Sequence, residues 1–145
     1  MCRYLYLASD KELPLIKCEE NRPAFNVAEL QDYDLDVLKQ FSKPHVVFLG
    51  AHTGCSCGFA YDSEPPENED QANEDRDARE SVKLLVQYLK EQAGMNSLEI
   101  FACWNGDQGE TPVATLSVEA DYFFHPSEFP IGDDPTFISI SKLDA

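Results

Sequence analysis

The sequence has little positive charge. It contains 11 lysine and arginine residues against 27 aspartates and glutamates, which gives its 145 residues a formal net charge of −16 at pH 7. Such a surface repels the phosphates of nucleic acids and the headgroups of anionic membranes. We therefore expect no nucleic-acid partner and no membrane partner. The same charge attracts basic proteins, so a basic protein partner is an expectation, and a small-molecule ligand of unknown identity stays open.

Long apolar runs are also missing. No run approaches the roughly 20 residues that a membrane helix needs. No basic segment precedes the short apolar run at residues 4–8, as a secretory signal peptide requires. We therefore expect a cytoplasmic protein. In that compartment the five cysteines, an odd number, should be mostly reduced and not paired in disulfides.

Apolar residues are otherwise plentiful. Hydrophobic residues make up 43% of the chain and aromatic residues 11%, which is typical of a folded domain and not of a disordered chain. A chain of this length is expected to form one globular domain over residues 1–145, with enough interior for a core.

Several segments have the short apolar or alternating pattern of β-strands. The clearest lie at residues 3–8, 46–49, 98–104, 113–124 and 136–143, with weaker extended segments at 14–18 and 23–30. We predict an α+β fold in which a mixed β-sheet of five to six strands is packed by one long and one short helix.

Two segments have helical periodicity. The longer covers residues 77–93 and ends at Gly94, a residue type common at helix C-termini. Its apolar stripe consists of Ala78, Val82, Leu85, Val86, Leu89 and Ala93. The shorter covers residues 34–41. Its predicted apolar face consists of Leu35, Leu38 and Phe41.

The segment at residues 62–75 is acidic and contains two prolines and few apolar residues. Such composition is typical of a surface loop. We predict a mobile acidic loop there, whose backbone amides exchange with solvent faster than those of residues 50–58.

Residues 50–58 have the sequence Gly-Ala-His-Thr-Gly-Cys-Ser-Cys-Gly and follow a buried-looking strand. His52, Cys55 and Cys57 supply one imidazole and two thiols. Zinc takes four such ligands in proteins, or three and a water, so these residues form a predicted metal site with zinc as its ion. Two alternatives stay open. The cysteines can be packing residues, or one can be a reactive thiol beside the histidine.

A second candidate segment follows the strand at 98–104. If that strand and the strand at 46–49 run parallel in one sheet, their C-terminal ends lie at the same edge, where ligands commonly bind. Trp104 would then form a wall of a ligand pocket, and Asn105 and Asp107 would supply its polar groups. The alternative for Asn-Gly-Asp is a tight turn with no binding role.

Three stretches resemble a group of small bacterial proteins of unknown function: Met-Cys-Arg-Tyr-Leu-Tyr-Leu-Ala-Ser at the start, the block from Pro44 to Phe59, and Cys-Trp-Asn-Gly-Asp at 103–107. The resemblance extends over most of the chain and implies no activity, cofactor or catalytic residue.

Three classes of function therefore remain. The protein is a metal-binding or thiol protein with its site at residues 52–57, an acidic module of inhibitor or immunity type that neutralises a basic partner, or a structural domain.

Overall fold

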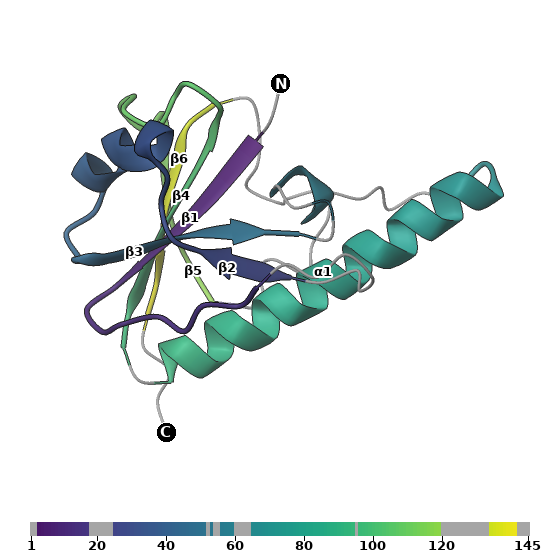
Figure 1. The fold of residues 1–145 in the computed structure, drawn as a ribbon, viewed down its shortest axis with the longest axis horizontal. Coiled ribbons are helices and arrows are strands. Elements are labelled where there is room, and N and C mark those ends of the chain that lie inside the picture. The colour runs from purple at the N-terminus through teal and green to yellow at the C-terminus, as the bar shows by residue number, and fades with distance from the viewer. Residues whose placement is uncertain are drawn as a thin grey trace.

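The structure, a computed structural model, describes residues 3–17, 25–51, 53, 56–59, 65–94, 96–119 and 134–141. In this part of the chain six strands form one sheet, in the order β2-β3-β1-β4-β6-β5 (Figure 1). The strands are β1 (Arg3–Ser9), β2 (Asn26–Ala28), β3 (His45–Gly50), β4 (Leu98–Trp104), β5 (Ala114–Val118) and β6 (Thr136–Ile140). β5 and β6 are parallel and the other neighbouring pairs are antiparallel. The mixed sheet of a single α+β domain is thus confirmed.

One face of the sheet is covered by a long helix, α1 (Glu69–Ala93). All six residues of the predicted apolar stripe are buried. All of them except Ala78 belong to one hydrophobic cluster with side chains from the sheet, among them Leu5, Leu49 and Ile100. Gly94 caps the helix through its backbone N–H, as predicted.

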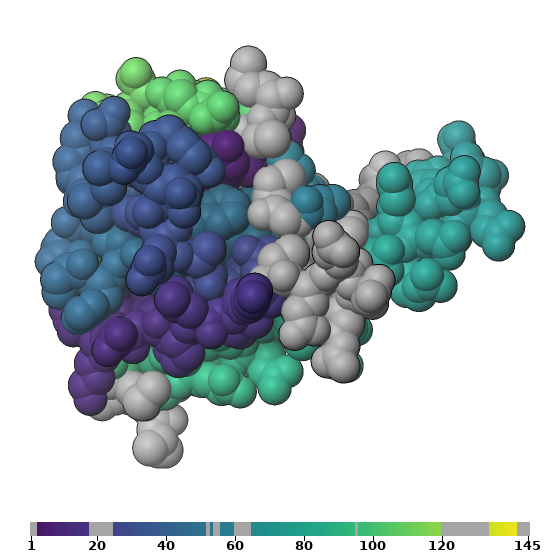
Figure 2. Space-filling model, in the orientation of Figure 1, coloured from purple at the N-terminus to yellow at the C-terminus, as the bar shows by residue number. Residues whose placement is uncertain are grey.

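The helix begins eight residues earlier than the sequence predicts, so residues 69–75 lie in α1 and the prediction of a loop there is wrong. Asn68 caps the helix, with its side-chain oxygen accepting the N–H of Gln71 at 2.8 Å. Acids in the first turn, Glu69 and Asp70, suit the positive end of the helix dipole. This half of α1 projects beyond the body of the protein (Figures 1 and 2). It buries no apolar stripe, so hydrophobic periodicity gave no sign of it.

The other face of the sheet is covered by η1 (Asp32–Gln40), a 3-10 helix. A helix was predicted in this region, but its predicted apolar face is wrong for two of its three residues; the third, Phe41, is partly buried and packs against the cluster on this face. Leu35 and Leu38 are 49% and 45% exposed, whereas Asp34 and Val37 are buried. A 3-10 helix has three residues per turn, so positions three apart lie on the same face. That spacing turns Asp34 and Val37 inward.

Several strands are shorter than predicted. β5 ends at Val118, and residues 120–124 of the predicted strand lie outside the described residues. β6 ends at Ile140. In the weak segment at 14–18, of which residues 14–17 are described, Ile16 forms a β-bridge to Val27 of β2.

Within the described residues, no helix offers the long and nearly uncharged apolar stretch that a membrane span requires. α1 has 25 residues, which is long enough to cross a bilayer. Its sequence, however, carries acidic and basic side chains along its whole length.

Candidate functional site

The two predicted loops start at the same end of the sheet. β3 and β4 are both antiparallel to β1, which lies between them, so they run in the same direction. Leu5 of β1 is opposite both Leu49 of β3 and Ala102 of β4. The C-terminal ends of β3 and β4 therefore lie beside the start of β1. The predicted convergence is correct in direction, although the two strands are not neighbours.

Ser56 fixes the chain after β3 to this end of the sheet. It begins the short 3-10 helix η2 (Ser56–Phe59) and is fully buried. Its hydroxyl donates to the carbonyl oxygen of Leu49 at 2.6 Å and accepts the backbone N–H of Leu5 at 2.8 Å. The serine between the two cysteines of the motif is thus a structural residue that ties η2 to both β3 and β1.

Cys57 and Trp104, two of the predicted site residues, both contact Arg3. The Sγ atom of Cys57 accepts the backbone N–H of Arg3 at 3.1 Å, and Cys57 is half-buried. The guanidinium carbon of Arg3 lies 4.5 Å from the centre of the Trp104 ring, a cation–π geometry. The sheet end therefore brings a partly accessible thiol, a cation and an indole together.

The remaining predicted metal ligands, His52 and Cys55, lie outside the described residues. Among the residues that the structure does describe, no three His, Cys, Asp or Glu side chains are grouped as metal ligands. Zinc binding through His52, Cys55 and Cys57 therefore stays a prediction.

Asn105 and Asp107 belong to a turn after β4. The N–H of Asp107 donates to the carbonyl oxygen of Trp104 at 3.0 Å, and Gly106 between them has a φ of +100°. Only glycine adopts such a backbone angle without strain. The turn interpretation of Asn-Gly-Asp is confirmed. Asn105 is exposed and Asp107 is half-buried at the turn, and their role in ligand binding stays a prediction.

A buried polar network under η1 was missed by sequence reasoning. The hydroxyl of Tyr6 donates to one carboxylate oxygen of Asp34, and the backbone N–H of Gln31 donates to the other at 2.8 Å. The side-chain amide of Gln108 donates to the Tyr6 hydroxyl oxygen at 3.3 Å. The side chains of Tyr6, Asp34 and Gln108 are each at least 97% buried. Burial first, and the hydrogen bond to Asp34 next, raise the pKa of Tyr6 above its ordinary value.

Cys103 lies beside this network and not with Cys57. Alternation along β4 turns Cys103 to the η1 face, where it packs with Phe101 and Val37, and turns Trp104 to the other face. Burial raises the pKa of the Cys103 thiol to about 12, and the charges of Asp107 and Asp34 act in the same direction. At neutral pH this cysteine is therefore a protonated packing residue.

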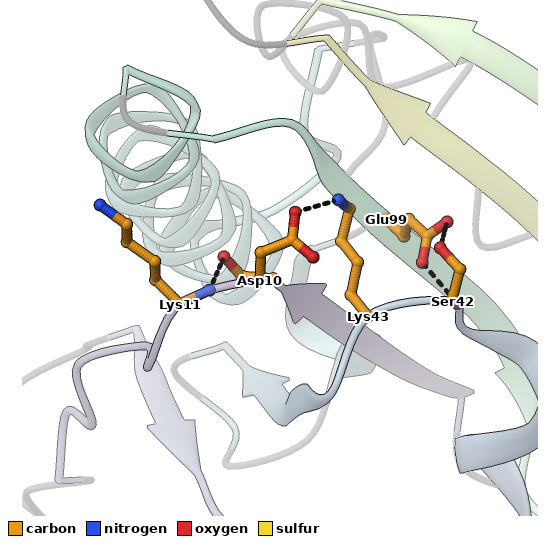
Figure 3. A network of polar contacts seen from close by, with 6 residues as sticks. Asp10, Lys11, Ser42, Lys43 and Glu99 are labelled. Carbon is orange, nitrogen blue, oxygen red and sulfur yellow. Dashed lines mark hydrogen bonds and ion pairs between the residues drawn. The ribbon is translucent and has the colours of Figure 1, made fainter.

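The opposite end of the sheet is closed by a second polar cluster (Figure 3). Both carboxylate oxygens of Glu99 accept hydrogen bonds from Ser42, one from its backbone N–H and one from its hydroxyl, each at 2.9 Å. Lys43 forms an ion pair with Asp10 at 2.8 Å. These contacts tie the connection between η1 and β3 to β4 and to the end of β1. They lie at the end of the sheet away from Cys57 and Trp104.

Two hollows on the described surface lie away from the predicted site residues. One, of about 410 Å³, lies along the N-terminal half of α1, between Pro66 and Lys83. The other, of about 250 Å³, lies between the segment around Leu13 and the start of β3. Neither is lined by Cys57, Trp104 or Asp107. The predicted site residues thus lie at a sheet end that these hollows do not reach.

No protein-family model, no curated protein and no solved structure matches the chain. Its function is therefore argued from its own residues.

Proposed function

We propose that the protein is an acidic protein-binding module that contacts a basic partner through the outer surface of η1. One observation carries the proposal: three large apolar side chains point outward from this helix. Tyr33, Leu35 and Leu38 are 62%, 49% and 45% exposed. Two acids, Asp32 and Asp36, and one base, Lys39, are also exposed on this helix.

The inner side of η1 anchors this surface firmly. Asp34 is held by Tyr6 and by the backbone of Gln31. At the other end of the helix, the side-chain amide of Gln40 donates to the carbonyl oxygens of Gln108 and Glu110, at 3.0 and 2.7 Å. A helix fixed in this way loses little conformational entropy when a partner binds its outer surface.

The chemistry of the outer surface fits a basic protein. Protein interfaces typically have aromatic and other apolar side chains at their centre, surrounded by a polar rim. A net charge of −16 accelerates encounter with a positively charged protein, and added salt weakens that attraction. Apolar contacts would then provide affinity, and the acids Asp32 and Asp36 would select the sign of the partner's charge.

The test compares two leucines of similar exposure. Leu35→Ser alters the proposed contact, and Leu15→Ser alters a leucine that is 54% exposed in another part of the surface. Each immobilised variant is incubated with lysate of the source cells at low salt, and bound proteins are identified by mass spectrometry. We expect a basic protein that salt releases and that Leu35→Ser binds about tenfold or more weakly, with Leu15→Ser unaffected. Equal capture by both variants would contradict the proposal.

A thiol or zinc site at Cys57 is a second candidate. It is favoured by the position of this half-buried sulfur, which accepts the N–H of Arg3 beside the Trp104 ring. With His52 and Cys55, Cys57 would supply three zinc ligands. Metal analysis of protein purified without a histidine tag tests the zinc site, and stoichiometric zinc is the supporting result. If the protein holds no metal, alkylation of Cys57 at neutral pH tests the thiol. A rate no faster than that of Cys103 would exclude Cys57 as a reactive thiol.

A further inference from the structure

The two edges of the sheet differ in how their backbone groups are used. β2, at one edge, has three residues. On its outer side, Val27 exchanges both backbone hydrogen bonds with Ile16, at 2.9 and 3.0 Å. The segment containing Ile16 therefore covers this short edge, and little of its backbone is available to another chain.

β5, at the other edge, pairs with β6 along all five of its residues, from Ala114 opposite Thr136 to Val118 opposite Ile140. Within the part of the chain that the structure describes, no hydrogen bond reaches the outer side of β5. Backbone N–H and C=O groups alternate between the two sides of a strand. Half of the groups of β5 therefore point outward, away from β6.

β5 also lacks the features that protect edge strands from pairing with other chains. Proteins usually place lysine, proline or a β-bulge on such strands. The sequence of β5 is Ala-Thr-Leu-Ser-Val, with no charge and no proline. Its register with β6 is continuous, so it contains no bulge. Within the described residues, the sequence and register of β5 therefore leave its outer edge able to pair with another strand.

We propose that the outer edge of β5 binds an extended, basic segment of a partner protein, which adds a seventh strand to the sheet. Addition of a peptide strand to an open sheet edge is a known mode of recognition, in which backbone hydrogen bonds provide affinity and alternate side chains provide specificity. The proposal goes beyond the proposed function, because β5 is a different surface from η1, and it rests on that function only for the sign of the partner's charge.

The side chains of β5 define which segment fits. Leu116 and Val118 are half-buried and pack against the core beneath α1, so the bound segment would place apolar side chains beside them. Thr115 and Ser117 are exposed on the other face, and Glu119 follows the strand. Basic side chains fit there. A second copy of this chain is a poorer occupant, because each copy carries a net charge of −16 and like charges repel.

The experiment uses a short synthetic peptide of alternating valine and lysine as the probe. Its control is the same peptide with N-methylated backbone amides, which keeps the charge and loses the hydrogen-bond donors. Amide hydrogen exchange of the intact protein is measured by NMR at low salt. We expect the first peptide to slow exchange of outward-facing amides in residues 114–118 by about tenfold or more, and the methylated peptide to leave them unchanged.

Charge variants test whether the peptide binds at β5. Ser117→Lys should weaken peptide binding about tenfold and Ser117→Glu should strengthen it. Gln87→Lys makes the same charge change at an exposed position of α1 and should have a much smaller effect. Thermal unfolding of each variant verifies that the fold is kept.

Three outcomes would overturn the proposal. Peptide binding that protects η1 and ignores Ser117→Lys would place the contact at η1 and leave the proposed function standing. Concentration-dependent dimers that protect β5 without peptide would make a second copy the occupant. No binding at low salt would exclude strand addition, and the proposed function would then be judged by the capture experiment with Leu35→Ser.

Discussion

The two faces of the sheet are attached to their helices by different interactions. Beneath α1, the buried cluster consists of hydrophobic side chains from the helix and the strands. Beneath η1, the hydrophobic cluster has four buried residues, namely Tyr6, Val37, Phe101 and Cys103. There the hydrogen bonds of Asp34 and Gln108 to Tyr6 join the helix and the turn after β4 to the sheet.

This difference has a physical consequence. Apolar packing is non-directional and scales with buried area, so the α1 face tolerates changes that keep volume and polarity. A buried polar network depends on each partner, because a polar group left unsatisfied costs more than its hydrogen bond contributed. The η1 face is therefore specified by few residues, and its helix presents an exposed apolar surface on the side away from the sheet.

The largest effect should come from a cavity beneath α1. Leu85 is fully buried at the centre of the α1 stripe. Leu85→Ala should lower the free energy of unfolding by about 3–5 kcal/mol, through lost burial and an unfilled cavity. Urea unfolding followed by circular dichroism measures this. Leu38→Ala, at a residue 45% exposed on η1, is the control and should cost less than about 1 kcal/mol. Equal losses would show that α1 is not the main source of stability.

The next effect compares two buried tyrosines. Tyr6 donates to the carboxylate of Asp34 on the η1 face, and Tyr88 donates to the backbone carbonyl of Pro14 at 2.8 Å on the α1 face. Tyr6→Phe should cost about 1.5–3 kcal/mol, because the hydrogen bond is to a charged group, and Tyr88→Phe about 0.5–1.5 kcal/mol. Chemical denaturation of both variants gives the comparison. A larger loss for Tyr88→Phe would contradict the inference that the polar network around Tyr6 specifies the η1 face.

The α1 face could be predicted from the sequence because its signal is local. Apolar residues from Ala78 to Ala93 repeat at helical spacing, and all six residues of the predicted stripe are buried, together with Ser81, Tyr88 and Gln92, which were not predicted. The inward face of η1 could not be predicted in this way. Asp34 is an acid, normally assigned to the surface, and its burial depends on Tyr6, 28 residues away. Gln108 lies 102 residues from Tyr6. A repeat within one segment cannot reveal contacts over such separations.

The candidate site, too, could be predicted from the sequence only in part. The common direction of β3 and β4 follows from general rules of sheet topology, and the turn at Gly106 follows from glycine's freedom at positive φ. The contact of Arg3 with both Cys57 and Trp104 depends on β1 lying between β3 and β4. The order of strands in a sheet is not written in any one segment of the sequence.

A smaller effect is a loss of stability at high pH, which should begin at a lower pH for Cys103 on the η1 face than for Tyr88 on the α1 face. The ordinary pKa of Cys103 is 9.0 and burial raises it to about 12 in the folded protein. The stability from this protonated thiol is thus complete below pH 9 and is lost as the pH rises from 9 toward 12. At pH 10 the loss should be about 1.4 kcal/mol. Tyr88, on the α1 face, has an ordinary value of 10.0, also raised to about 12, so its contribution begins to fall later.

Denaturation of wild type and Cys103→Ala between about pH 8 and pH 10 tests this assignment. The variant should be less stable at pH 8, because a buried side chain has been shortened, but its stability should change less on going to pH 10. A wild-type stability that stays level over this range, or an equal decline in Cys103→Ala, would remove Cys103 as the source.

The smallest effect concerns the N-terminal half of α1, which projects beyond the body of the protein. Asn68 caps the helix by accepting the N–H of Gln71 at 2.8 Å, and Asn68→Ala removes this acceptor at a local cost of about 1 kcal/mol. Because residues 69–77 bury little apolar surface, the loss should appear as roughly fivefold faster amide exchange there, with the urea midpoint of the whole domain almost unchanged. Asn73→Ala is the matched control. Asn73 is exposed inside the same half of the helix, where alanine is the better helix former, so this substitution should slow exchange slightly. If Asn68→Ala lowers the global midpoint as much as a core substitution does, the projecting half must unfold together with the α1 face, and the helix is one cooperative unit from Glu69 to Ala93.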